Sequence, residues 1–142
     1  AEVAAPHRQL VGLLLDFGKE IHGYVELFTP MTGSQAKLRS VRVRFGESVS
    51  EAMSDIGGAK NATNDHAVRD QTCLVPWLGT HEIGNTGFRF VRIDLVEPKG
   101  FVQLKSARAV FLHRELDWKG SFRSSDERLN EIWRIGAWTV FL

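Results

Sequence analysis

The stretch Val41-Arg42-Val43-Arg44-Phe45 alternates strictly between apolar and charged residues. A period of two is typical of a half-buried β-strand, because successive side chains of a strand point to opposite faces of its sheet. We expect Val41, Val43 and Phe45 to face a core and both arginines to face solvent. The same kind of pattern recurs along most of the chain and decides its fold class.

Five further runs have strand character and are separated by turn residues such as Gly18 and Pro30. They span residues 11–17, 22–28, 67–75, 88–96 and 101–113. Between Phe90 and Val91 the alternation slips by one residue, which indicates a β-bulge or a change of sheet. Residues 97–100 are expected to join the last two strands as a hairpin.

Residues 47–66 break the alternation. They contain Gly57-Gly58 and several Asn, Asp and Ser residues without a sustained period, so we predict a long surface loop with room for one short helical turn. Strands without intervening helices, in a chain of 142 residues, favour a mostly β fold. The expected architecture is an antiparallel β-sandwich of jelly-roll-like type, followed by one C-terminal α-helix.

The C-terminal helix is predicted from the residues after Gly120. Ser124 and Glu127 have the spacing of a capping box, which marks a helix start. Two apolar stripes follow at helical spacing, formed by Leu129, Ile132, Trp133, Gly136 and Val140 and by Ile135, Trp138 and Leu142. A helix that is apolar nearly all round belongs inside a larger body, so we expect the chain to be a piece of a longer protein.

Charge and composition exclude several classes of partner. The chain has 18 Lys and Arg against 17 Asp and Glu, a formal net charge of +1, and its basic residues are dispersed. We therefore expect no nucleic-acid partner and no membrane partner. No apolar run approaches the ~20 residues that span a bilayer. The five histidines lack metal-ligand spacing, so we predict no metal site and no cofactor.

Several segments, in order, resemble the region before the catalytic domain of bacterial α-L-rhamnosidases, a family of glycoside hydrolases. The first contains Asp16-Phe17-Gly18 followed by Gly23-Tyr24, and the second is the strand from Val41 that ends on Glu47. Three more complete the series, at residues 67–70, 86–91 and 120–130. The last of these is similar to the entry into the first helix of the family's catalytic barrel.

The resemblance implies a β-sandwich module followed by an (α/α)6 barrel that hydrolyses terminal α-L-rhamnosides with inversion. It implies an accessory β-sandwich over residues 1–119, and a linker with the first helix of a truncated α-helical catalytic domain over 120–142. The catalytic acids would lie beyond Leu142, so we assign no catalytic residue here and expect the chain alone to be inactive. A bacterial protein of the periplasm or the exterior is implied as well.

Three residues are candidates for ligand binding. Trp77 lies in a predicted loop, where an aromatic ring could stack on a pyranose. Glu47 and Arg89 fall in family-like motifs and could contact sugar hydroxyls, or they could instead tie strands together by ion pairing. Asp65 and Asp70 could be offered as an acid pair, but a solvated loop position is the alternative for both.

Two other functions compete with a supporting role for a catalytic barrel. A free-standing carbohydrate-binding module would use Trp77 as an exposed platform. A structural interaction domain would dock its terminal helix on a partner chain. For the barrel-supporting role, the partners are a rhamnose-containing glycan through the parent enzyme and a catalytic α-helical domain that packs on Trp118, Trp133 and Trp138.

Overall fold

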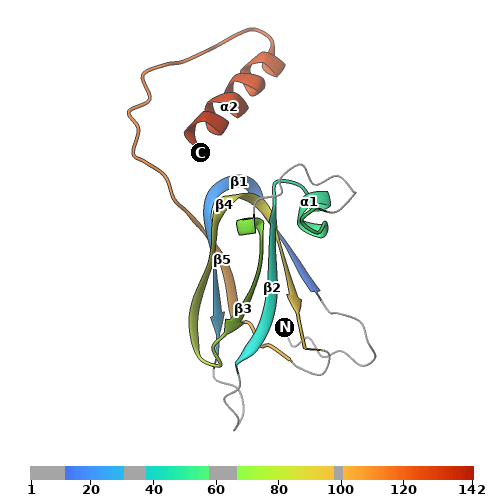
Figure 1. Cartoon of the computed structure of the whole chain (residues 1–142). Helices are drawn as coiled ribbons and strands as arrows, with labels where there is room; N and C mark the ends of the chain where they lie inside the picture. The colour runs from blue at the N-terminus through green and yellow to red at the C-terminus, as the bar shows by residue number, and fades with distance from the viewer. Residues whose placement is uncertain (1–11, 31–37, 58–66, 98–100) are drawn as a thin grey trace. The chain divides into compact units, whose positions relative to one another are not determined.

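The computed structural model describes residues 12–30, 38–57, 67–97 and 101–142. The chain divides into two compact units, Ala1–Phe111 and Leu112–Leu142, and each has a fold of its own (Figure 1). The elements of the first unit are β1 (Gly12–Thr29), β2 (Arg39–Gly46), α1 (Val49–Met53), a 3-10 turn η1 (Ala67–Arg69), β3 (Asp70–Val75), β4 (Gly79–Leu95) and β5 (Ser106–Phe111). The second unit contains α2 (Glu127–Phe141).

The five strands form one sheet in the order β3-β2-β4-β1-β5, and all neighbours are antiparallel. The predicted mostly β, antiparallel fold with a C-terminal helix is therefore confirmed. Among the described residues the strands do not divide into two separate hydrogen-bonded sheets. The described strands therefore form one five-stranded antiparallel sheet, and the two-sheet arrangement of the predicted sandwich is not seen in them.

Two irregularities bend the long strands β1 and β4. The register between them shifts between Asp16 and Ile21, and again between Gly23 and Val25. Gly18 has φ +81° at the first shift, and Gly84 has φ +99° close to the second. These left-handed conformations suit glycine, because a side chain would be strained there. The slip predicted at Phe90–Val91 does not coincide with a register shift, because Val91 and Phe90 pair in succession with Leu15 and Asp16. The nearest shift lies between Phe88 and Phe90.

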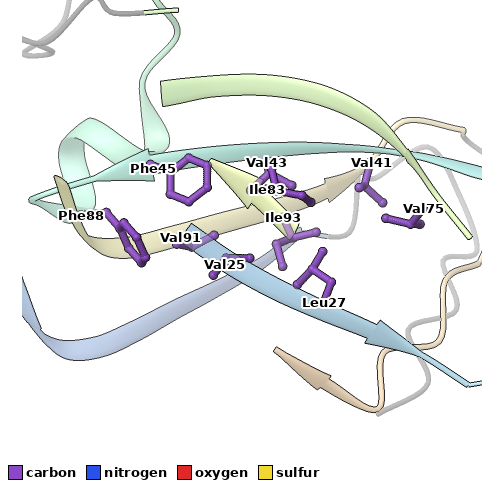
Figure 2. Packing of buried hydrophobic residues seen from close by; sticks show 10 residues of the cluster. All are labelled: Val25, Leu27, Val41, Val43, Phe45, Val75, Ile83, Phe88, Val91 and Ile93. Atoms are coloured by element: carbon purple, nitrogen blue, oxygen red, sulfur yellow. The ribbon is translucent and has the colours of Figure 1, made fainter. Parts of the chain in front are cut away.

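The bend brings distant parts of β4 together around one core. Gly84 and Val91 would lie roughly 23 Å apart on a straight strand. Yet a Cβ on Gly84 would lie 2.6 Å from the ring of Phe45, whose backbone pairs with Val91. Figure 2 shows Val25 and Leu27 of β1 on the opposite side of this core from β2. The buried cluster contains Val25, Leu27, Val41, Val43, Phe45, Val75, Ile83, Phe88, Val91 and Ile93.

Some predicted strand boundaries were wrong. Residues 12–17 and 22–28 belong to the single strand β1, because Gly18 forms a bulge rather than a turn, and Val11 lies outside the described residues. The first half of β4, residues 79–87, was missed. Residues 98–100 lie outside the described part of the chain, but the hairpin predicted there is wrong, because β1 lies between β4 and β5 in the sheet.

The short helix α1 lies within the predicted loop and confirms its helical turn. Ser48 caps its start by accepting a hydrogen bond from the backbone N–H of Glu51. At its other end Arg69 Nη1 donates to the carbonyl oxygen of Glu51, at 2.8 Å. A Cβ on Gly46 would lie 2.5 Å from the backbone nitrogen of Ala52, so only glycine permits this close approach. Residues 58–66 of the predicted loop lie outside the described residues.

The helix α2 begins two residues later than the predicted capping box. Asp126 is its N-cap, and the Asp126 side chain accepts a hydrogen bond from the backbone N–H of Arg128. The backbone of Ser124 is instead held by the side chain of Asn130, through bonds of 2.7 and 2.9 Å. No residue of α2 is buried. Within the described residues, no helix has both the length and the apolar character that crossing a bilayer requires.

Candidate functional site

The turn between β3 and β4 displays Trp77. Val75 ends β3 in the core, and the carbonyl oxygen of Pro76 accepts a 2.6 Å hydrogen bond from Thr29 Oγ1 at the end of β1. This anchor holds the turn, and the side chain of Trp77 remains 38% exposed. Leu78 beside it is exposed too. The turn therefore offers an apolar, aromatic surface on which the C–H face of a sugar ring could lie.

Arg89 is occupied by an ion pair across β1 and β4. Its Nε and Nη2 donate to Asp16 Oδ1 and Oδ2 at 2.8 and 2.9 Å, and its guanidinium lies 4.8 Å from the ring centroid of Phe90. Asp16 Oδ1 also accepts from the backbone N–H of Gly18, at 2.7 Å. The hydrogen bond from Arg89, with that from Gly18, lowers the pKa of Asp16 to about 2. This geometry corresponds to the strand-tying alternative for Arg89.

Glu47 follows β2 and belongs to a different cluster. Its backbone N–H donates to Glu51 Oε2 at 2.8 Å. A Cβ on Gly87 would lie 3.8 Å from Oε1 of Glu47 and equally far from Oε1 of Glu20, so the two carboxylates flank that glycine. Partial burial of the carboxyl group raises the pKa of Glu47, and the nearby charges of Glu20 and Glu51 raise it further. Glu47 and Arg89 thus have different neighbours and are not paired with each other in the described contacts.

An ionic network that the sequence did not predict covers the outer face of β2 and β4. Arg44, expected to face solvent, is only 7% exposed, because α1 packs over it and the carbonyl oxygen of Met53 accepts from Arg44 Nη1. Its Nη2 lies 2.7 Å from Asp94 Oδ2, and Arg92 Nη2 lies 2.8 Å from Asp94 Oδ1. Burial would raise the pKa of Asp94, but the hydrogen bonds from Arg92 and Arg44 lower it overall.

Asp70 extends the network onto β3. Its carboxylate accepts two hydrogen bonds from Arg42, at 2.8 and 2.5 Å. Asp65, the other half of the acid pair considered above, lies outside the described residues. The signal that could have predicted the network is the matched alternation of charges on Arg42, Arg44, Arg92 and Asp94 in two strands that prove to be neighbours.

The second unit carries a cluster of aromatic residues, of which Trp118, Phe122 and Trp133 are exposed and Trp138 and Phe141 are half-buried. The ring of Phe141 lies 5.3 Å from that of Trp118 and 5.5 Å from that of Trp138, measured between centroids. Trp133 stacks on Phe122 at 6.4 Å and 23°. Trp118 is 55% exposed although it contacts Phe141. Such a grouping of large apolar side chains at the surface is typical of a packing surface.

Metal ligands are not grouped in the described part of the chain. Among residues 12–30, 38–57, 67–97 and 101–142, no three His, Cys, Asp or Glu side chains are arranged to hold a metal ion. His7 and His66 lie outside these ranges. Asp16, Asp70 and Asp94 of the sheet instead face arginines.

Comparison with known proteins gives one structural match. No protein-family model and no curated protein matches the chain. Its fold is similar to that of a rhamnosidase from Klebsiella oxytoca with rhamnose bound, with a TM-score of 0.78 and 16% sequence identity. The match covers 99% of this chain and 28% of that protein, so the chain spans less than a third of its length. The resemblance to rhamnosidases is thus confirmed in the fold, which is similar to that of one part of the Klebsiella oxytoca protein.

Proposed function

We propose that this chain is the non-catalytic β-domain portion of an α-L-rhamnosidase-like glycoside hydrolase, and that it supports an α-helical catalytic domain. The observation that carries the proposal is the structural match, which extends over 99% of the chain and so includes both units. The order of the family-like motifs supports the same conclusion independently of the fold.

The state of three aspartates in the sheet agrees with a non-catalytic role. Inverting glycosidases need an acid of raised pKa and a base, roughly 6.5–9.5 Å apart with room for water. Asp16, Asp70 and Asp94 each accept hydrogen bonds from arginine, and the pKa values of Asp16 and Asp94 are lowered. A carboxylate held in its charged form by arginine is a poor proton donor, so these groups suit the joining of strands rather than acid catalysis.

The segment after the sheet would provide the contact with the catalytic domain. In this proposal residues 1–119 form the accessory domain, and residues 120–142 form a linker and the first helix of the catalytic domain. Trp118, Trp133 and Trp138 offer the large apolar surface that such a contact needs. Its burial would remove the exposed apolar surface of α2 from water.

Hydrolysis of a chromogenic aryl α-L-rhamnoside tests the proposal. The isolated chain should release no aglycone above background. A polypeptide that carries this chain together with its helical domain should hydrolyse the substrate and give the β-anomer first, as NMR of the fresh product would show. Absence of rhamnoside hydrolysis by that longer polypeptide, while it hydrolyses another glycoside, would overturn the assignment.

The exposure of Trp77 favours a second candidate, a carbohydrate-binding module. This function predicts that rhamnose-containing glycans bind the isolated chain and that Trp77→Ala removes the binding. Calorimetric titration of the glycan into both proteins decides the matter. No heat from the unmodified chain would exclude this function and leave the supporting role as the proposal.

A further inference from the structure

The central part of β1 directs alternate side chains to opposite faces of the sheet. Val25 and Leu27 are fully buried in the core. Because the side-chain period of a strand is two, Tyr24, Glu26 and Phe28 lie on the face that points away from the core. All three are partly accessible to solvent, and the supporting role proposed above does not involve them.

The two neighbouring strands add charged groups beside Glu26. Glu26 lies opposite Glu82 of β4 on one side and opposite Arg108 of β5 on the other. Arg108 Nε donates to Glu26 Oε1 at 2.9 Å, and Arg108 and Glu82 are both exposed. A row of hydrogen-bonding groups therefore crosses the sheet between the positions of Tyr24 and Phe28.

Phe28 lies in a second row, which contains hydroxyl groups. Its neighbours across the sheet are Thr80 of β4 and Ser106 of β5. The ammonium group of Lys105 lies 5.7 Å from the centroid of the Phe28 ring. Lys105 is exposed, and a contact between an ammonium group and a ring is weak at an exposed site. This long side chain is therefore able to move aside and donate to a ligand on the ring.

The composition of this face restricts the class of ligand. An apolar protein surface would bury the ion pair of Glu26 and Arg108, which is costly when both groups lose contact with water. A nucleic acid needs an excess of basic groups, but here Glu26 and Glu82 balance Arg108 and Lys105. A neutral carbohydrate matches both kinds of group. Its C–H faces stack on aromatic rings, and its hydroxyl groups bond with carboxylate and guanidinium groups.

The spacing of the two aromatic residues restricts the length of the ligand. Tyr24 and Phe28 are four residues apart on one strand, which corresponds to roughly 13 Å. One sugar ring is able to stack on only one aromatic ring at this separation. An oligosaccharide that runs along β1 reaches both rings and passes over the ion pair of Glu26 and Arg108 between them.

We propose that Tyr24 and Phe28 bind a neutral oligosaccharide that lies along β1, and that Glu26 and Arg108 hydrogen-bond its hydroxyl groups between the two rings. The site does not include Trp77. It rests on the proposed function in one respect only, that the sugar is rhamnose.

Calorimetric titration of the 142-residue chain tests this proposal with four probes. They are an α-L-rhamnose tetrasaccharide, cellotetraose, free L-rhamnose and tetragalacturonate. The neutral rhamnose tetrasaccharide should bind saturably, and about tenfold or more tightly than free L-rhamnose. Tetragalacturonate should bind more weakly than the neutral chain. Saturable binding of neither neutral tetrasaccharide, equal binding of the monosaccharide, or tighter binding of tetragalacturonate would overturn the proposal.

Matched variants assign the binding to this face. Tyr24→Thr and Phe28→Thr remove a ring but keep a residue that favours strands, and each should weaken the bound tetrasaccharide by about tenfold or more. Trp77→Ala should change its affinity by less than about twofold. Thermal melts check that each variant is folded. Binding that is lost in Trp77→Ala and kept in Tyr24→Thr would contradict the proposal.

A measurement on the unmodified chain does not depend on the folding of any variant. Tyr24 is the only tyrosine of the chain, so the NMR signals of a tyrosine ring belong to it. Nuclear Overhauser effects should connect these ring protons with C–H protons of the bound tetrasaccharide. A bound tetrasaccharide without such effects would place the site elsewhere and overturn the proposal.

The outcome is separable from that of the enzymatic proposal. Hydrolysis of the aryl rhamnoside by the longer polypeptide, with no tetrasaccharide bound by the isolated chain, would contradict this face alone. Binding of cellotetraose at Tyr24, with no rhamnoside hydrolysis, would support the face and contradict the rhamnosidase assignment.

Discussion

The two units of this chain differ in where their apolar residues find partners. The first unit buries ten hydrophobic residues in one cluster, drawn from four strands of its own sheet. The helix of the second unit buries none of its residues, although it contains two tryptophans and several aliphatic side chains. Apolar side chains thus stabilise the first unit by packing on one another, whereas those of α2 remain at least partly exposed to solvent. Substitutions in the two units should therefore have unequal effects on the free energy of unfolding.

Phe45→Ala should have the largest effect. Phe45 is fully buried and packs on Phe88 with ring centroids 5.1 Å apart, so its truncation should lower the free energy of unfolding by about 3–5 kcal/mol. Ile132→Ala in α2, where the side chain is exposed, should change it by less than about 0.5 kcal/mol. Urea unfolding measures both. Equal losses would show that α2 is as well packed as the sheet.

Gly84→Ala should have the second-largest effect on the free energy of unfolding. The substitution places a Cβ against the ring of Phe45 and a side chain at φ +99°, for a combined cost of about 2–4 kcal/mol. Gly57→Ala is the matched control, since its φ is +69° but nothing lies within 4 Å of the new Cβ, and it should cost about 1 kcal/mol. If the two variants have the same urea midpoint, the bend of β4 does not depend on close packing at Gly84.

Arg44→Met should cost about 1–3 kcal/mol, because it leaves the buried carboxylate of Asp94 with one arginine fewer. Arg108→Met provides the comparison, since Arg108 pairs with Glu26 at an exposed position and should cost less than about 1 kcal/mol. Chemical unfolding at pH 7 gives both values. A smaller loss for Arg44 than for Arg108 would count against the network as a stabilising feature of the sheet.

Glu47→Gln should stabilise the folded chain slightly, in contrast to the three substitutions above. The pKa of Glu47 in the folded chain lies above its ordinary value of 4.5, so its charged form is disfavoured by folding. At neutral pH the variant should therefore be the more stable protein, by less than about 1 kcal/mol. The difference should vanish as the pH falls through the raised pKa toward 4.5. Thermal melts from pH 7 to 4 test this, with the exposed Glu82→Gln as control. A gain independent of pH would refute the charge effect.

Removal of residues 124–142 should have the smallest effect on the stability of the sheet. The urea midpoint of the first unit should stay nearly unchanged, because the core cluster contains no residue of α2. Light scattering should fall, because the exposed apolar side chains of the helix are gone. A clear loss of sheet stability on truncation would show that the two units depend on each other.

The sequence predicted what depends on local alternation. Val41, Val43 and Phe45 are buried as expected, whereas the nearest change of register lies between Phe88 and Phe90 and not at the predicted position Phe90–Val91. The hairpin at residues 97–100 was predicted wrongly, because the neighbours of a strand depend on contacts far along the chain. Arg44 was wrongly predicted to face solvent, because the helix that covers it, α1, has only five residues and no apolar periodicity that would predict it.

The candidate site was predictable only in its components. Trp77 was recognised as a loop aromatic, and the structure places it on an anchored turn with its side chain partly exposed. Arg89 and Glu47 were selected together, but their neighbours are Asp16 in one case and Glu20 and Glu51 in the other. The partner of Arg89 lies 73 residues away in sequence, so no local motif identifies it.

The position of β1 between β4 and β5 has a kinetic consequence. Arg108 pairs with Glu26, 82 residues earlier, so β1 can complete its pairing only after most of the first unit has been synthesised. At roughly 5–20 residues per second, this strand waits roughly 4–16 s on the ribosome without its final neighbour. Pairing between such distant segments also makes folding slow. The newly made chain therefore passes through a period in which Val25, Leu27 and Phe28 of β1 lack their neighbours in β5.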